Sequence, residues 1–311
     1  MAQGDSRVFI EEYLQDVRKQ GFRPSAWARY GSRGWRKVKA DAAANPDAVR
    51  SILLLSLLLF GLFFVVSIGL AVLTDLETAR RALVWTGVLL VPLTAALLLH
   101  VGLLVDRDGY PLPAVNLPTA ITVARVALVP LLVISLQDGH WRTAFWVFLI
   151  AAISDVADGW LARRLGQETR LGQVLDPIHD IFFNLSLFWG MFVAGLVGPW
   201  VLGLALVRYG GLLLGGIFLY VVRGPVHIQS TLPGKVTGLL LGVLVGFLLL
   251  VPAYGGGEMG RVLSPLARDG LLVLLSGSVV HAAVMGWFNF RHAGLAAEAG
   301  RRVIRGVRFG E

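Results

Sequence analysis

Long apolar runs constrain this chain more than any other feature. The first, SILLLSLLLFGLFFVVSIGLAVL at residues 51–73, contains no charged residue. A helix needs about 20 such residues to cross a bilayer, and lipid offers the backbone no hydrogen-bond partners outside a helix or a closed barrel. Hydrophobic residues make up 56% of the chain and charged residues only 15%, unlike a soluble domain. We therefore predict an all-α, polytopic membrane protein.

The apolar runs predict eight membrane-spanning helices. About fifty polar and basic residues precede the first run, so we expect a true span there and not a cleavable signal peptide. The stretch YGGGEMGRVLSPLARDG (254–270) is interpreted as an exposed loop. The expected spans are 51–73, 82–105, 118–136, 142–163, 172–196, 199–222, 236–253 and 270–290.

The distribution of basic residues predicts the orientation. The first fifty residues contain ten Lys and Arg and the last twenty-one contain five. The connection after the fourth span adds Arg163, Arg164 and Arg170. Because basic loops stay in the cytoplasm, we expect both termini and this connection on the cytoplasmic side of a bacterial inner membrane.

The formal charge of +8 also bears on partners. The basic residues flank apolar runs, which favours anionic lipid headgroups over nucleic acid. Aromatic and cationic residues mix in VFIEEYLQDVRKQGF and WARYGSRGWRKVK. This segment is either an interfacial amphipathic helix that binds lipid or a solvated tail whose charges only set orientation.

The chain contains no cysteine. Disulfides, thiolate nucleophiles and zinc–thiolate sites are therefore excluded. Any metal must be bound by oxygen or histidine ligands.

Four aspartates gather in DVADGWLARRLGQETRLGQVLDPIHD, residues 155–180. Asp155 and Asp158 lie three apart on one helical face, and Asp176 and Asp180 lie four apart on the next helix. A short connection makes these helices antiparallel neighbours, so the carboxylates can converge. Four like charges at a membrane boundary repel unless cations lie among them. Oxygen ligands suit Mg²⁺ or Mn²⁺, and a pair of ions suits phosphoryl chemistry.

Small residues and an arginine accompany the acids. Gly159, Ala162 and Gly172 would leave space for a ligand or for a neighbouring backbone, and Arg163 could bind a phosphate in bidentate fashion. Taken alone, the small residues are more typical of tight helix packing, and an aspartate pair is also typical of a cation relay in a transporter. The complete set is harder to explain as packing.

The set resembles the signature of the CDP-alcohol phosphatidyltransferase family. NLPTAITVARVALVP, upstream, is similar to the first core helix of that family, and the resemblance extends over about residues 116–291. The matching pattern is Asp155-x2-Asp158-Gly159-x2-Ala162-Arg163-x8-Gly172-x3-Asp176-x3-Asp180.

The resemblance implies a six-helix membrane fold, usually dimeric. It implies transfer of a phosphatidyl group from CDP-diacylglycerol to a small alcohol or alcohol phosphate, with release of CMP. Asp155, Asp158 and Asp176 would bind metal, and Asp180 would both bind metal and act as general base. Gly159, Ala162, Arg163 and Gly172 would contact the CDP group.

The stretches TRLGQVLDP and LPGKVTG look most like phosphatidylglycerophosphate synthases, whose acceptor is glycerol 3-phosphate. Arg208, Arg223 and Lys235 are candidates to bind the acceptor phosphate. Ile181 stands where the family often has lysine, and Tyr209 stands where such synthases tend to carry an acid. Inositol phosphate, phosphatidylglycerol and an amino alcohol therefore stay open as acceptors.

We expect four parts along the chain: a basic cytoplasmic tail (1–50), two additional spans (51–105), the six-helix catalytic domain (116–291) and a basic tail (292–311). Three rival functions remain. An intramembrane prenyltransferase would carry aspartate clusters on two separate hairpins, and a transporter would scatter acids over several spans. A catalytically silent scaffold would share the fold.

Overall fold

The computed structural model describes residues 14–106, 108–223, 232–255 and 257–307, with side chains for all of these except 219, 223, 259 and 288–307. Within these ranges the chain is helical, and its only β-pairing is an isolated bridge between Val105 and Pro111. The all-α prediction is confirmed. The elements are α2 (Pro24–Ala44), α3 (Pro46–Leu73), α4 (Leu76–Leu99), η1 (Val101–Leu103), α5 (Leu117–Ala127), α6 (Val129–Gln137), α7 (Trp141–Leu165), α8 (Arg170–Val193), α9 (Pro199–Ala205), η2 (Leu206–Gly210), α10 (Gly211–Arg223), α11 (Leu232–Tyr254) and α12 (Gly257–Val307).

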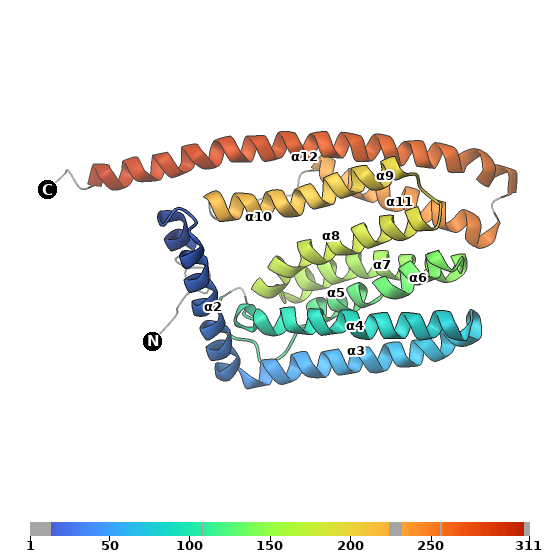
Figure 1. Ribbon diagram of the computed structural model, residues 1–311, viewed down its shortest axis with the longest axis horizontal. Coiled ribbons are helices and arrows are strands. Elements are labelled where there is room, and N and C mark those ends of the chain that lie inside the picture. Colours follow the sequence, from blue (N-terminus) through green and yellow to red (C-terminus); the bar gives the residue numbers. More distant parts are fainter. Residues whose placement is uncertain (1–13, 107, 224–231, 256, 308–311) are drawn as a thin grey trace.

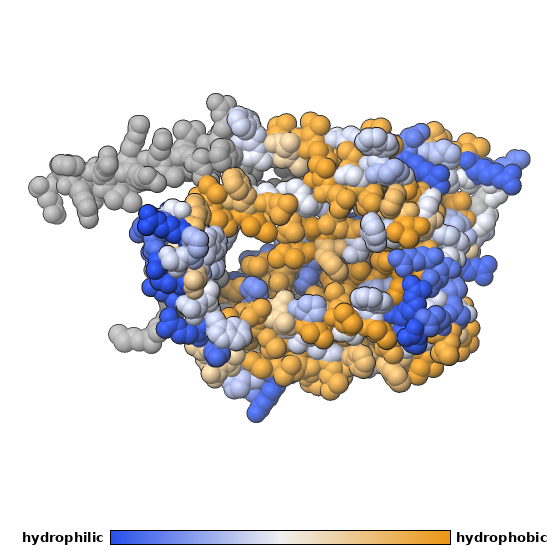
Figure 2. Space-filling model, viewed as in Figure 1, coloured by the Kyte–Doolittle hydropathy of each residue, from blue (hydrophilic) through white to orange (hydrophobic). Residues whose placement is uncertain are grey.

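The helices α3 to α12 lie side by side in a bundle (Figure 1). Seven helical stretches of the described residues are long and apolar enough to cross a membrane, one fewer than predicted. The expected span at 172–196 forms α8, but its acidic and polar side chains lower its hydropathy below that of the others. With 24 residues, α8 is about 36 Å long, which is long enough to cross. Hydrophobic residues cover the sides of the bundle and hydrophilic residues cover its two ends (Figure 2).

The two additional spans, α3 and α4, form an antiparallel hairpin beside α5 and α6. The side chain of Asn45 caps α3, and that of Asp75 caps α4. The hydroxyl oxygens of Ser56 and Thr94 lie 2.6 Å apart and join the two helices. The Thr86 hydroxyl donates to the Ala127 carbonyl oxygen across the contact with α5. The extra spans are therefore packed onto the bundle and are not a separate unit.

The first core span is divided into α5 and α6. Pro130 lies in the first turn of α6 and cannot donate a backbone hydrogen bond, so the helix breaks at Leu128. On the N-terminal side of this break, α5 packs against both α7 and α8. The central apolar cluster, which includes Leu132, Phe188 and Leu271, lies on the C-terminal side, around α6. The break thus separates an apolar half of the bundle from a half that contains polar side chains.

Helix α2 lies across one end of the bundle, nearly at right angles to the other helices (Figure 1). The Arg18 guanidinium, just before α2, donates to the backbone carbonyls of Tyr220 and Val221 at the end of α10, each at 2.7 Å. At the other end of α2, the Asn45 amide donates to the Leu112 carbonyl oxygen at 2.9 Å. The N-terminal segment therefore bridges opposite sides of the bundle.

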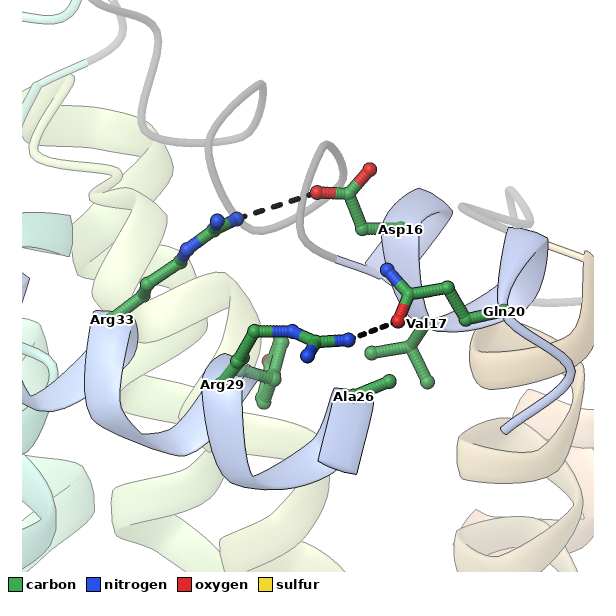
Figure 3. A pocket seen from close by; sticks show the side chains of 7 residues that line it. Asp16, Val17, Gln20, Ala26, Arg29 and Arg33 are labelled. Carbon is green, nitrogen blue, oxygen red and sulfur yellow. Dashed lines mark hydrogen bonds and ion pairs between the residues drawn. The ribbon is translucent and has the colours of Figure 1, made fainter. Parts of the chain in front are cut away.

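Helical residues 14–19 fold back against α2 and enclose a cavity of about 30 Å³ (Figure 3). Arg33 pairs with Asp16 at 3.3 Å, and Arg29 donates to the side-chain oxygen of Gln20. A cavity of this size has room for little more than a water molecule. The cavity is too small for a substrate, and the contacts of Arg33 with Asp16 and of Arg29 with Gln20 hold the N-terminal segment against α2.

Residues 257–270 are helical, so the predicted loop is wrong for this part, although most of its described residues are exposed as predicted. Helix α11 ends at Tyr254 and α12 begins at Gly257. Gly255 and Gly257 have φ of +68° and +52°, a backbone conformation that glycine adopts without strain. The chain therefore reverses within a few residues, and packing of α12 on α11 stabilises helix beyond this point. The backbone of α12 continues to Val307, so the predicted tail at 292–311 is largely helical in its backbone.

Candidate active site

Helix α7 carries the first acidic pair and α8 the second, and their connection is short, as predicted. Gly166 ends α7 with φ of +63°, the left-handed conformation of a glycine C-cap. Thr169 caps α8 by accepting a hydrogen bond from the Gly172 backbone N–H at 3.1 Å. Helix α5 packs against both helices, so the acids of α7 and α8 meet over α5.

A buried arginine lies at the centre of the acids. Arg125 of α5 is only 4% exposed and pairs through Nη1 with Asp155. Its Nη2 lies 2.9 Å from an oxygen of Asp180 and 3.7 Å from an oxygen of Asp158. One turn earlier, the Thr122 hydroxyl donates to Asp158 at 3.0 Å. Three carboxylates thus share one guanidinium.

The sequence interpretation missed Arg125. The residue lies in NLPTAITVARVALVP, whose similarity to the first core helix of the family does not by itself assign a role to Arg125. An ionisable side chain within a predicted span is a functional candidate in its own right. That signal could have identified Arg125.

Asp176 belongs to the same cluster. It interacts electrostatically with Asp158, Asp180 and Arg125. A Cβ atom at Gly172 would lie 3.6 Å from both the Asp176 carboxylate and the Thr119 hydroxyl. Glycine at this position lets α5 and α8 approach closely beside Asp176. The four predicted acids are therefore gathered in one place.

The acids point toward Arg125 and do not form a ready-made metal cage. Among the residues that the structure describes, no three acidic or histidine side chains are arranged to hold a metal ion. The donor atoms are all carboxylate oxygens, which suit Mg²⁺ or Mn²⁺. The side chains of Asp155 and Asp180 are 56% and 50% exposed, so there is room around them for other rotamers. The chemistry of the site therefore fits divalent ions.

The predicted CDP-contacting residues of α7 follow the first acidic pair. Nη1 of Arg163 lies 3.4 Å from the position that a Cβ atom would take at Gly159. The guanidinium therefore lies against the backbone that follows Asp158. Ala162, in the same turn as Arg163, is half-buried. The contact of Gly159, Ala162 and Arg163 with the CDP group stays a prediction.

A cavity of about 870 Å³ adjoins the acids, between α7, α8, η2 and α11. Asp155, Asp180 and Arg125 line one part of it. Arg208 and Lys235, two of the predicted acceptor-binding residues, also line it, and its remaining wall is mainly apolar. The cavity thus joins carboxylates and cations that are far apart in the sequence. Arg223, the third predicted cation, ends α10, and its side chain lies outside the described residues.

Arg208 lies in a single turn of π-helix, η2, between α9 and α10. Such turns are frequent at functional sites because they displace side chains from the regular helical face. The Arg208 guanidinium lies 5.1 Å from the ring centroid of Tyr209, and its Nη1 is buried with no hydrogen-bond partner in the described structure. A buried cationic donor in this state is ready to bind an anion. His179, by contrast, is buried and does not line the cavity.

Comparison with known proteins decides the family. A family model described as CDP-alcohol phosphatidyltransferase matches residues 115–287. The chain belongs to this family. The match begins just before α5 and ends within α12, so α2, α3 and α4 lie outside the matched region.

Several curated proteins are similar in sequence to this chain. The "CDP-diacylglycerol--glycerol-3-phosphate 3-phosphatidyltransferase" of Aquifex aeolicus is 28% identical over 55% of this chain and 96% of its own. A "Probable phosphatidylglycerophosphate synthase" of Mycobacterium tuberculosis is 32% identical over 52% of this chain and 78% of its own. A "Putative cardiolipin synthase" of the same species is 35% identical over 42% of this chain and 62% of its own. No solved structure matches the chain significantly.

Membership identifies the protein as a membrane-bound transferase of phospholipid synthesis. All of the signature residues lie within the matched region. Two residues, Ile181 and Tyr209, depart from the phosphatidylglycerophosphate synthase pattern, and they differ in their position relative to the cavity. Tyr209 lies in the cavity beside Arg208, whereas Ile181 does not line the cavity.

Proposed function

We propose that this phosphatidyltransferase transfers the phosphatidyl group of CDP-diacylglycerol to glycerol 3-phosphate and releases CMP. The cavity supports this proposal because it joins the acids to Arg208, whose Nη1 has no partner in the described structure. Two relatives are named for the same acceptor or its product.

The acids would act on the donor and on the acceptor hydroxyl. The acceptor oxygen forms a bond to the phosphorus that carries diacylglycerol, and the bond from this phosphorus to the CMP oxygen breaks. CMP leaves with the electron pair of that bond. Asp180 lines the cavity and is half-exposed, so it would accept the hydroxyl proton as general base.

The donor would be bound at the acidic end of the cavity. Asp155, Asp158, Asp176 and Asp180 would hold two Mg²⁺ or Mn²⁺ ions. When bound, such ions neutralise the diphosphate and stabilise the leaving CMP. Arg163 would bind a phosphate of the CDP group, and Gly159, Ala162 and Gly172 would leave it space.

The acceptor phosphate would be bound by Arg208 and Lys235. Arg208 offers a buried donor, and Lys235 lines the same cavity from α11. Arg223, the third predicted cation, ends α10 about 20 Å along the helix from Arg208, too far to share one phosphate with it. A phosphorylated acceptor is favoured because a neutral alcohol would leave these cations without a counter-charge.

Phosphatidylglycerol is the second candidate acceptor. The cavity is large and its wall mainly apolar, with Phe145, Phe148 and Leu239 among the lining residues. These side chains could accommodate part of an acyl chain. A relative named as a putative cardiolipin synthase is consistent with this alternative.

The acidic end of the bundle would face the cytoplasm, and α2 would rest on anionic headgroups. Support comes from the basic residues of the N-terminal segment and from exposed Trp27 and Trp35 on α2. Tryptophan is enriched at membrane interfaces, and lysine or arginine attracts anionic lipid. A homodimer in a bacterial inner membrane is proposed from the family resemblance.

One experiment tests the reaction and the acceptor together. Purified protein in detergent would receive labelled CDP-diacylglycerol, Mg²⁺ or Mn²⁺, and one alcohol at a time: glycerol 3-phosphate, phosphatidylglycerol, inositol phosphate or an amino alcohol. We expect CMP and phosphatidylglycerophosphate with glycerol 3-phosphate. Cardiolipin formed only with phosphatidylglycerol would establish the second candidate. Absence of CMP with every acceptor would favour a scaffold or transporter.

A further inference from the structure

Arg125 is a buried cation that the proposed reaction does not use. It projects from α5 into the acids of α7 and α8, and it also lines the cavity. Burial of an unpaired guanidinium is unfavourable, and the carboxylates compensate for it. Nε of Arg125 is nevertheless buried without a hydrogen-bond partner in the described structure. The carboxylates therefore balance the charge of Arg125 but leave one of its hydrogen-bond donors, Nε–H, without an acceptor.

The charges of the cluster do not balance with Arg125 alone. With all groups ionised, four carboxylates and one guanidinium leave three negative charges in excess. Two divalent ions would more than compensate this excess, and an anionic diphosphate would then be attracted. Arg125 is therefore sufficient to hold acids near one another but insufficient to neutralise them.

The three carboxylates around Arg125 differ in mobility. Asp158 is only 11% exposed and accepts a second hydrogen bond from Thr122. Asp155 and Asp180 are about half-exposed, and Arg125 is their main partner. Asp155 and Asp180 can therefore leave the guanidinium by side-chain rotation, whereas Asp158 is held in place.

We propose that Arg125 is a resident counter-ion, a positioning residue that divalent ions displace. Before metal binds, it holds Asp155, Asp158 and Asp180 together. When metal binds, Asp155 and Asp180 turn from the guanidinium to the ions while Asp158 keeps its bond to Thr122. This inference rests on the proposed metal-dependent function.

The proposal predicts the direction of two effects. Arg125 and the ions compete for the same carboxylate oxygens, and a positive charge a few ångströms away repels a divalent ion. Loss of that charge should therefore strengthen metal binding, by about tenfold or more. The same loss leaves the acids mutually repelling when no metal is present, so the metal-free protein should be less stable. A bound metal should then restore most of the lost stability.

The test compares Arg125→Gln and Arg125→Lys with the wild type, using full-length protein in detergent. Arg81→Gln is the matched control, because it removes an arginine that pairs with Asp138 at 2.9 Å, far from the four acids in the fold. Mn²⁺ affinity is measured from the spectroscopic signal of free Mn²⁺, and melting temperature is measured with chelator and with saturating Mn²⁺.

We expect Arg125→Gln to bind Mn²⁺ about tenfold more tightly, to melt earlier in chelator and to recover with Mn²⁺. Arg125→Lys keeps the charge but cannot bridge the carboxylates as a fork, so it should have an affinity between those of Arg125→Gln and the wild type. The Arg81→Gln control should bind Mn²⁺ as the wild type does.

Unchanged or weaker Mn²⁺ binding in the Arg125 variants, with a loss of stability that Mn²⁺ does not relieve, would overturn the counter-ion role. If Arg125→Gln does not fold, the affinity of Arg125→Lys decides the matter. Should the wild type bind Mn²⁺ and release CMP while the variants fail these expectations, only this inference falls. Should the wild type bind no divalent ion and release no CMP, the proposed function falls with it.

Discussion

Two arginines of the cavity, the buried Arg125 and the half-buried Arg208, have opposite surroundings. The Arg125 guanidinium is surrounded by carboxylates, whereas the Arg208 guanidinium lies over an aromatic ring with one nitrogen unpaired in the described structure. A guanidinium without an anion in an apolar region is costly unless a ligand supplies the anion. At the scale of single residues, one cation is paired with the acids, and we propose that the other binds the substrate phosphate.

Replacement of Asp180 by Asn should abolish phosphatidyl transfer. The amide has the shape of the carboxylate but cannot accept the hydroxyl proton, and loss of a general base typically lowers turnover about 100-fold to 10,000-fold. CMP release measures turnover, and binding of labelled CDP-diacylglycerol together with the melting temperature shows whether the protein stays folded. Asp138→Asn, which changes an acid paired with Arg81 away from the cavity, should keep its activity. Full turnover by Asp180→Asn would remove Asp180 from its assigned role.

Replacement of Arg208 by Gln should raise KM for the acceptor with little change in CDP-diacylglycerol binding. A charge-assisted hydrogen bond to phosphate contributes about 1.5–3 kcal/mol, or roughly tenfold to 150-fold in affinity. Steady-state kinetics with glycerol 3-phosphate measure the change. Arg142→Gln is a suitable control, because Arg142 also lies over a tyrosine, Tyr254, but does not line the cavity. An equal rise in KM for both variants would contradict the assignment of Arg208.

At the scale of elements, helix ends and helix breaks place the functional side chains. Pro130 divides the first core span, and the π-helical turn η2 redirects Arg208. Both irregularities interrupt an otherwise continuous helix and lie next to polar side chains. The N-terminus of α4 shows the same dependence on a local cap, since Asp75 accepts bonds from both the backbone and the side chain of Thr78.

The cap of α4 should make stability depend on pH. The bond from the Thr78 backbone N–H is the main reason why the pKa of Asp75 is lowered to about 2. A lowered folded-state pKa contributes stability above the unfolded pKa of about 4, and this contribution is lost as pH falls toward about 2. Melting temperatures of wild type and Asp75→Ala should therefore differ near neutral pH and converge from about pH 5 to about pH 2. A difference in melting temperature that stays constant with pH would contradict the capping role of Asp75. Asp47→Ala, at an exposed position, serves as the control.

Helix α2 should be protected by anionic lipid. Arg36 and Lys39 are exposed on α2, and Lys39 lies 5.5 Å from the ring centroid of Trp35. In nanodiscs, hydrogen exchange of α2 should slow when anionic lipid replaces zwitterionic lipid, and added salt should reverse the effect. The double variant Arg36→Glu, Lys39→Glu should lose this response. Equal exchange in both lipids would favour the solvated-tail interpretation.

At the scale of the whole molecule, the polar ends and apolar sides of the bundle define how it sits in a membrane (Figure 2). The connection between α7 and α8 lies at the same end as α2, since the Arg170 backbone N–H bonds the Val105 carbonyl and α2 contacts η1. A water-soluble acceptor would reach the acids from this end. The acyl chains of the lipid donor and of the lipid product would remain in the membrane at the sides of the bundle.

The absence of cysteine makes the orientation simple to test. Gln167→Cys lies exposed in the connection between α7 and α8, and Arg80→Cys lies exposed near the start of α4. A membrane-impermeant maleimide should label Gln167→Cys only in inside-out vesicles and Arg80→Cys only in right-side-out vesicles. The reverse pattern would contradict a cytoplasmic active site.

The sequence alone determined that this protein lies in a membrane and which aspartates form its acidic cluster. Apolar runs predict spans because their length must match the bilayer, and the aspartates follow a fixed spacing that local helix geometry turns onto one face. The prediction of a loop at 254–270 was wrong for residues 257–270. The glycines produce a turn only where the chain reverses, and packing on α11 stabilises helix in the residues that follow.

Only the tertiary structure decided which charges meet. Arg125 and Arg208 lie in separate helices, and no local pattern relates their positions to those of Asp155 and Asp180. Packing of α5 between the two acidic helices brings Arg125 among three carboxylates, and the cavity places Arg208 opposite them. The physical reason is that spacing along a helix follows from backbone geometry, whereas contacts between helices depend on how all of them bury their side chains together.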